Sequence, residues 1–123
     1  MQQQVVLREV LIVEDEPPIA SVLASIVEEC GYIALLATNG KQALAILQHH
    51  HPSLILTDLM MPLMNGAELI TALRALEMQL PPIVIMSAAG RHNIIGAGAD
   101  AIMDKPFDIE DVEALLHHFL RER

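Results

Sequence analysis

The chain has 123 residues and a formal net charge of −9, and 53% of its residues are hydrophobic although few are aromatic. This length suits a single domain over residues 1–123 with a sizeable aliphatic core. The negative charge argues against direct nucleic-acid binding, which requires a basic face. No apolar run is long enough to span a bilayer, and residues 1–4 lack the basic start of a signal peptide. We therefore expect a cytoplasmic protein without membrane contact.

Short apolar runs alternate with helical patterns along the chain. The strands are expected at Glu9–Val13, Ile33–Ala37, 54–58, 83–86 and 101–103. Runs buried on both faces are typical of parallel strands. The strand–helix alternation therefore predicts an α/β fold, with a parallel sheet covered by helices on both faces.

Helix boundaries are marked by local signals. Pro17 and Pro18 suit a first helical turn, and Gly31 suits the end of that helix. Asn39 precedes a second helix that ends before Pro52, a third helix is expected at residues 66–77, and Asp108 caps the last one. The residues expected to face the core from the first, third and last helices are Ile19, Val22, Leu23, Ile26, Val27, Cys30, Leu69, Ile70, Leu73, Leu76, Ile109, Val112, Leu115, Leu116, Phe119 and Leu120.

Polar residues follow the strand ends, where an aliphatic core would not need them. They are Glu14 and Asp15, Asp58, Ser87, and Lys105. The carboxyl ends of parallel strands share one edge, which is where open α/β sheets bind ligands. Crowded carboxylates repel one another unless a cation intervenes, and such oxygen ligands suit Mg²⁺. With a lysine and a hydroxyl nearby, the set indicates phosphoryl transfer onto an aspartate.

The motifs LIVEDE (11–16), LTDLMMP (56–62) with NG (65–66), MSA (86–88) and DKPF (104–107) resemble those of the receiver domains of two-component response regulators, CheY-like proteins with a flavodoxin-like fold. The resemblance covers nearly the whole chain and implies a doubly wound five-stranded sheet in the order 2-1-3-4-5.

The resemblance also implies roles for individual residues. Asp58 would accept a phosphoryl group from a histidine kinase or a histidine phosphotransfer protein, and the domain would then switch an interaction surface for a downstream output. Mg²⁺ would be held by Asp15, Asp58 and the backbone carbonyl of Met60, with Glu14 acting through water. Lys105 and Ser87 would contact the phosphoryl group, and the Lys105–Pro106 bond would be cis. Such a domain is not an enzyme beyond catalysing its own phosphorylation and slow dephosphorylation.

The sequence departs from the family pattern in several places. Ile102 stands where receivers commonly carry Tyr or Phe, and the segment between Ser87 and Lys105 is short and rich in glycine. These departures predict a short or irregular fourth helix and an atypical output face. Met60 and Ala89 stand at positions where neither side chain can position an attacking water, so we expect a persistent aspartyl phosphate.

The sequence also allows two other functions. A degenerate receiver could act as an interaction module without phosphorylation, as Ile102 suggests. A phosphatase with an Asp nucleophile is disfavoured, because Met60 occupies the place of its second acid. Cys30 is the only cysteine, which rules out an intrachain disulfide. The run His49–His51 suits a helix end better than a metal site. His117 and His118 are expected at the surface.

Overall fold

The structure is a computed structural model that describes residues 7–76, 79–88 and 98–121. Its five strands form one parallel sheet in the order β2-β1-β3-β4-β5. The strands are β1 (Glu9–Val13), β2 (Ile33–Ala37), β3 (Leu54–Asp58), β4 (Ile83–Ser87) and β5 (Ala101–Asp104). The predicted fold class and strand order are confirmed.

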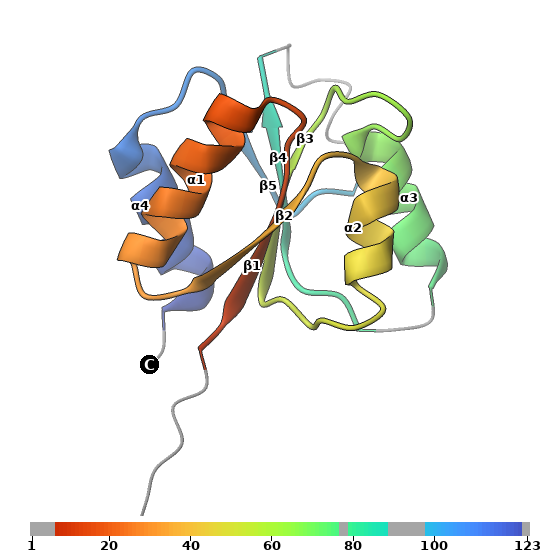
Figure 1. The fold of residues 1–123 in the computed structure, drawn as a ribbon, viewed down its shortest axis with the longest axis horizontal. Helices are drawn as coiled ribbons and strands as arrows, with labels where there is room; N and C mark the ends of the chain where they lie inside the picture. Colours follow the sequence, from red (N-terminus) through yellow and green to blue (C-terminus); the bar gives the residue numbers. More distant parts are fainter. Residues whose placement is uncertain (1–6, 77–78, 89–97, 122–123) are drawn as a thin grey trace, which may run out of the picture.

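Helices cover both faces of the sheet (Figure 1). Helices α1 (Pro17–Glu29) and α4 (Ile109–Leu120) pack on one face, and α2 (Gly40–Ile46) and α3 (Gly66–Ala75) on the other. Two aliphatic clusters separate these helices from the sheet. Both faces of the central strands are thus covered, which explains why β3 and β4 are uninterrupted runs of buried residues.

The predicted helix starts at Asn39 and Asp108 are confirmed. Asn39 accepts a hydrogen bond from the backbone N–H of Gln42, and Asp108 forms a reciprocal capping box. Asn65, which was not predicted as a cap, forms a second capping box at the start of α3. Gly31 follows α1 with φ 95°, a conformation that glycine adopts without steric cost. These local signals fix where each helix starts or ends, and so where the neighbouring strand ends lie.

The prediction that Val22, Leu76 and Ile109 face the core is wrong. Val22 and Ile109 are about half exposed, and Leu76 is also exposed. Helix α3 ends at Ala75, and Leu76 already has extended backbone with ψ 135°. Val22 and Ile109 lie on faces of α1 and α4 that no described element covers. The 3.6-residue periodicity predicted too wide an apolar stripe on these helices.

The predicted short fourth helix falls mostly on residues 89–97, which lie outside the described residues, and it stays a prediction. Among the described residues, no helix is long and apolar enough to cross a membrane.

Candidate functional site

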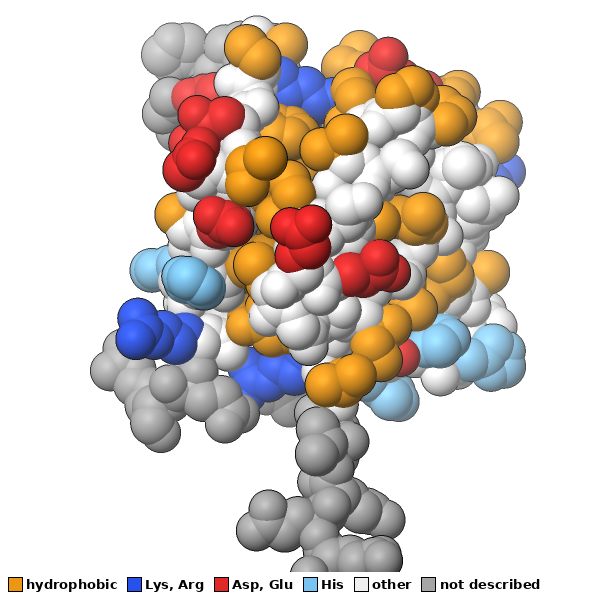
Figure 2. All heavy atoms as spheres, turned by 60° about the vertical axis from the view of Figure 1, so that its left-hand side comes forward, with side chains coloured by type: hydrophobic (Ala, Val, Ile, Leu, Met, Phe, Trp, Pro, Cys, Tyr) orange, Lys and Arg blue, Asp and Glu red, His pale blue; other side chains and the backbone are white. Residues whose placement is uncertain are grey.

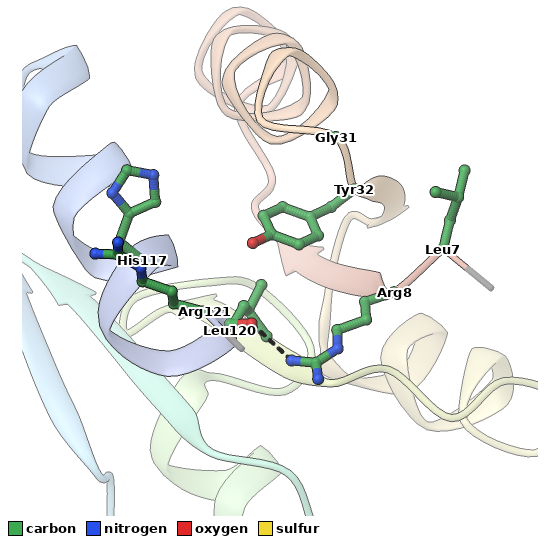
Figure 3. Close-up of a pocket in the computed structure, with 7 residues that line it drawn as sticks. All are labelled: Leu7, Arg8, Gly31, Tyr32, His117, Leu120 and Arg121. Carbon is green, nitrogen blue, oxygen red and sulfur yellow. Dashed lines mark hydrogen bonds between the residues drawn. The ribbon is translucent and has the colours of Figure 1, made fainter. Parts of the chain in front are cut away.

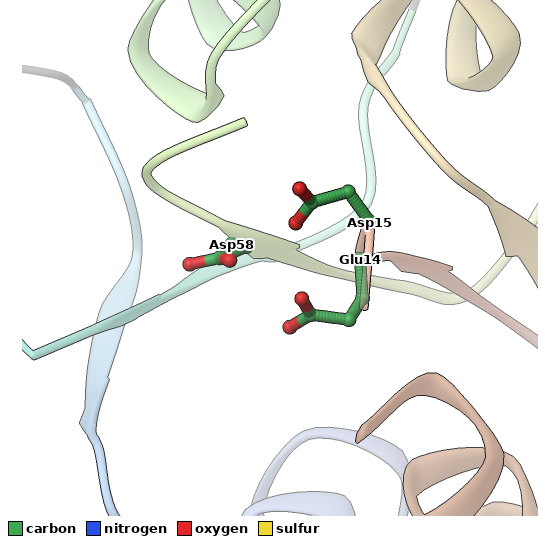
Figure 4. A group of neighbouring side chains, drawn as sticks. All are labelled: Glu14, Asp15 and Asp58. Atoms are coloured by element: carbon green, nitrogen blue, oxygen red, sulfur yellow. The ribbon is translucent and has the colours of Figure 1, made fainter. Parts of the chain in front are cut away.

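Carboxylates from two neighbouring strand ends meet at one edge of the sheet. Glu14 and Asp15 follow β1, and Asp58 is the last residue of β3, which pairs with β1 in parallel register. The three side chains project to the same side of the strand ends (Figure 4). Each offers an oxygen within 4.8 Å of the others. The predicted convergence of these acids is confirmed.

Lys105 bridges two of the acids. Its Nζ atom lies 3.3 Å from Oε1 of Glu14 and 3.2 Å from Oδ2 of Asp58. Its backbone N–H donates to the carbonyl oxygen of Ser87, and the Lys105–Pro106 peptide bond is cis, as the resemblance implied. Lysine therefore supplies positive charge directly beside the Asp58 carboxylate.

Burial makes this charge cluster unusual. Glu14 is 2% exposed and Asp58 is 6% exposed. Removal from water and the nearby Asp58 charge raise the pKa of Glu14, although the Glu16 backbone N–H and Lys105 favour its charged form. Burial lowers the pKa of Lys105, but its hydrogen bond with Asp58 and the charges of both acids outweigh this, and the net pKa is raised. The lysine is thus held protonated, and the carboxylates would gain from a further cation.

The donor set fits a magnesium ion. Three carboxylates grouped at the sheet edge are hard oxygen ligands within reach of one another. Aspartate and glutamate are also the ligands that Mg²⁺ accepts while it keeps part of its water shell.

Two further predicted site residues, Ser87 and Met60, belong to the ends of β4 and β3, which are neighbours in the sheet. Ser87 is buried at the end of β4, opposite Asp104 in the β5 register. Met60 lies in the loop after β3, with its side chain 71% exposed. Ile102 is partly buried and packs against the aliphatic core cluster between the sheet and helices α2 and α3. Because the methionine side chain ends in a thioether, Met60 offers no side-chain oxygen or nitrogen to a water near Asp58.

Two residues near Asp58 were given no role by the sequence reasoning. Thr57 is fully buried, and its hydroxyl donates a 3.0 Å hydrogen bond to the carbonyl oxygen of Asp58. Gly66 approaches the same carbonyl so closely that an added Cβ would lie 2.6 Å from it. A polar residue in the apolar run 54–57 was a signal for Thr57. Nothing in the sequence distinguishes the close approach of Gly66 from an ordinary turn.

Comparison with known proteins agrees with this geometry. Residues 10–117 match the family described as response regulator receiver domain. The chain belongs to this family and is a receiver domain of two-component response regulators. The presence of the acidic pocket does not favour the alternative of a receiver that works without phosphorylation.

Relatives of known name include response regulators. The chain is 34% identical to response regulator Rre1 of Synechocystis over 89% of its own length and 50% of that protein. It is 37% identical to the phosphate regulon transcriptional regulatory protein PhoB of Pseudomonas aeruginosa, over 91% of this chain and 51% of that protein. The chain thus spans about half the length of the curated relatives it matches.

Solved structures share the fold over their whole length. Chemotaxis response regulator CheY4 of Vibrio cholerae matches with a TM-score of 0.86 and 27% identity, over 94% of this chain and 100% of that one. The receiver domain of sensor histidine kinase PA1611 of Pseudomonas aeruginosa has a TM-score of 0.86 and 25% identity, with 95% and 100% covered. That structure holds a magnesium ion in its active-site cleft.

Proposed function

We propose that Asp58 is the phosphoacceptor of this receiver. The observation that carries the proposal is the position of Lys105, whose Nζ contacts both Asp58 and Glu14 within the carboxylate cluster. Glu14 shares the burial and the lysine contact, but Asp58 is the only buried aspartate among the described residues, and it is the last residue of the central strand β3. The proposed domain spans residues 1–123.

The reaction is a transfer of a phosphoryl group. A carboxylate oxygen of Asp58 attacks phosphorus of a phosphohistidine, the P–N bond breaks, and its electron pair returns to the imidazole nitrogen. Lys105 stabilises the negative charge that spreads over the phosphoryl oxygens, and Ser87 hydrogen-bonds one of them in the product. The chain is in this sense a participant in its own phosphorylation rather than an enzyme acting on other molecules.

Mg²⁺ is the proposed cofactor. Asp15, Asp58 and the Met60 backbone carbonyl would hold it, with Glu14 acting through water. When bound, it supplies positive charge that lets the donor phosphate approach three acids. The magnesium ion in the PA1611 receiver domain supports this assignment by similarity.

The proposed partner is a histidine kinase or a histidine phosphotransfer protein, and an apolar groove beside Lys105 suits its docking. The lining side chains are Pro18, Ile19, Val22, Ala88, Lys105, Pro106 and Phe107. Val22, which was expected in the core, instead lines this groove and is half exposed. A partner helix lying across α1 would bury this surface and bring its phosphohistidine to Asp58.

The phosphoryl group would then switch a surface read by an output domain or protein. PhoB of Pseudomonas aeruginosa, a relative that extends beyond this chain, is a transcriptional regulatory protein, which is consistent with an attached or separate output. We further propose that the domain acts in the cytoplasm, where kinase transmitter regions would meet it.

Incubation with acetyl phosphate and MgCl₂ tests the acceptor. Intact-mass spectrometry should show one added phosphoryl group, and none when EDTA replaces Mg²⁺ or in Asp58→Asn. Asp104→Asn is the matched control, because Asp104 is an exposed aspartate at the end of β5 on the same edge. Undiminished uptake by Asp58→Asn would refute the assignment.

A further inference from the structure

Strand β2 is an open edge of the sheet. It pairs with β1 on one side, and no described strand lies on its other side. The N–H of Ile33 donates to the carbonyl oxygen of Arg8, just before β1, and the carbonyl oxygen of Ala37 accepts from the residue just after β1. Backbone groups alternate in direction along a paired strand. The N–H and C=O groups of Ala34 and Leu36 therefore point outward, away from β1.

The open part of this edge is bounded at both ends. Before it, the N–H of Tyr32 donates a 3.1 Å hydrogen bond to the carbonyl oxygen of Val27, and the Tyr32 ring projects toward α4 (Figure 3). After it, the N–H of Thr38 donates a 2.8 Å hydrogen bond to Oε1 of Gln42. The two outward N–H groups between these positions have no partner in the described part of the chain.

No charge or proline protects the β2 edge. Residues 32–39 read YIALLATN and contain neither. The other edge strand, β5, ends in Asp104 and leads directly into Lys105 and Pro106. Edge strands usually carry charges or proline, which oppose pairing with another chain. Acidic side chains are spread over the face shown in Figure 2, in a protein of net charge −9, so β2 is a place where two copies would bring no like charges together within the paired strands.

The side chains of β2 are self-complementary in size. Leu36 is 49% exposed and Ile33 is 37% exposed. By strand alternation, Leu36 shares one face of the sheet with Ala34, and Ile33 shares the other with Ala37. A second β2 strand, antiparallel to the first and centred on Leu35, would place each exposed large side chain opposite an alanine of the other strand. Both exposed side chains would then be covered.

We propose that two copies of this chain pair through β2. Around a two-fold axis at Leu35, the N–H groups of Ala34 and Leu36 would donate to carbonyl oxygens of Leu36 and Ala34 in the second copy, which would donate in return. One sheet would then continue through both copies. A two-fold interface requires a surface that is complementary to itself, and the outward hydrogen-bonding groups and the side-chain sizes of β2 both meet this requirement.

This pairing is separate from phosphorylation. Asp58 lies in β3, and β1 lies between β3 and β2 in the sheet. Because the two β2 strands run antiparallel, the carboxylate clusters of the two copies would lie at opposite edges of the joined sheet, and both would stay open to a phosphodonor. The substitution Asp58→Asn should therefore leave the dimerisation constant unchanged.

A simpler explanation is that water satisfies the outward backbone groups, and that the exposure of Leu36 and Ile33 has no function, as for many apolar side chains at protein surfaces. That explanation predicts a monomer at every concentration. It also predicts that the amides of Ala34 and Leu36 exchange hydrogen at a rate that does not depend on protein concentration.

Sedimentation velocity of the purified chain, from micromolar to millimolar concentration, separates the two explanations. We expect a dimer fraction that rises with concentration. Amide hydrogen exchange at Ala34 and Leu36 should slow as the dimer forms, because these groups become paired. The amide of Ile102, on the other edge strand, should exchange at the same rate at all concentrations.

Three variants locate the interface, and circular dichroism checks that each is folded. Leu36→Lys should weaken dimerisation by about tenfold, because the two-fold axis removes the leucine side chain from the interface twice. Ala34→Pro removes an outward donor without breaking a bond to β1, and should weaken dimerisation by at least about tenfold. Ile109→Lys makes the same change of charge at a half-exposed position on α4 and should have no effect.

A chain that stays monomeric at millimolar concentration, with its edge open to some other extended peptide, would overturn the proposal. Equal dimerisation of Leu36→Lys and the wild type would also overturn it, as would dissociation caused by Ile109→Lys and not by Leu36→Lys.

Discussion

Nζ of Lys105 lies 3.2 Å from Oδ2 of Asp58, so the fifth strand delivers a cation to the carboxylate at the end of the third. The same nitrogen contacts buried Glu14 at 3.3 Å. One lysine thus balances part of the charge of two acids that water cannot reach freely. Substitutions at this site should therefore change the phosphorylation rate and the stability of the fold separately: loss of Lys105 should slow the reaction, and loss of the Glu14 charge should stabilise the fold.

Lys105→Met should slow phosphorylation of Asp58 by acetyl phosphate by about 10²-fold, because a fixed charge at the developing phosphoryl charge is lost. Rates of phosphoprotein formation at saturating Mg²⁺ measure this effect. Lys41→Met is the control, since Lys41 is exposed on α2. A rate for Lys105→Met within a factor of about two of wild type would contradict the assigned role.

Glu14→Gln should stabilise the protein at neutral pH without Mg²⁺. The pKa of Glu14 is raised above its ordinary value of 4.5, chiefly by burial, so its ionised form costs free energy in the folded state. The wild type should therefore gain stability as the pH falls from neutral toward 4.5, and the advantage of the variant should shrink over that range. Thermal unfolding at a series of pH values measures both trends.

Mg²⁺ should stabilise the wild type more than it stabilises Glu14→Gln. It stabilises the folded wild type by binding its carboxylates, whereas Glu14→Gln has one acid fewer in the cluster. The rise in Tm on adding MgCl₂ should thus be larger for the wild type. An equal rise in both proteins would show that Glu14 contributes nothing to the ion site.

Met60→Asn should shorten the lifetime of the Asp58 phosphate by roughly tenfold, because an amide beside the phosphoryl group can orient an attacking water. Loss of phosphate after removal of the donor is the measurement. Leu63→Asn is a suitable control: Leu63 is exposed in the same loop and has φ 69°, which asparagine tolerates. Equal decay in Met60→Asn and wild type would remove the argument for a persistent phosphate.

Gly66→Ala should destabilise the fold by about 1–3 kcal/mol, because the new Cβ would lie 2.6 Å from the Asp58 carbonyl oxygen and the backbone would have to shift. Gly40→Ala is the informative comparison. Its Cβ would meet Cγ and Sδ of Met64, which can rotate away, and Cβ of Met64 at 2.8 Å, which moves only with the loop backbone, so we expect a smaller loss than from a clash with the carbonyl at the end of β3. Urea unfolding of both variants ranks them, and the reverse order would contradict the close-approach explanation.

Val22→Asp should slow phosphotransfer from a histidine kinase while leaving phosphorylation by acetyl phosphate unchanged. Val22 is half exposed on the groove beside Lys105, so a charge there opposes docking without entering the core. Single-turnover transfer from a phosphorylated kinase is compared with labelling by the small donor. If both rates are unaffected, the partner does not dock on this groove.

The sequence predicted most of the fold because its signals were local. Continuous apolar runs marked β3 and β4, and Asn39 and Asp108 marked helix starts by a hydrogen bond within a single turn. The convergence of Glu14, Asp58 and Lys105 followed from parallel topology, in which strand ends share an edge.

What the sequence could not predict depends on contacts between distant segments. The exposure of Val22 and Ile109 depends on which elements pack beside α1 and α4, and helical periodicity carries no such information. The pocket lined by Arg8, Tyr32 and Arg121 brings together three separate segments, with no shared motif. The close approach of Gly66 to the Asp58 carbonyl likewise depends on how the loop after β3 folds back, which the sequence does not show.

Chemical mapping of the acyl phosphate tests the central claim most directly. After incubation with acetyl phosphate and Mg²⁺, borohydride reduces a phosphoaspartate to homoserine, which tandem mass spectrometry locates in a peptide. We predict homoserine at position 58 and at no other aspartate. Homoserine at Asp15 or Asp104 with position 58 unmodified would contradict the assignment of the phosphoacceptor.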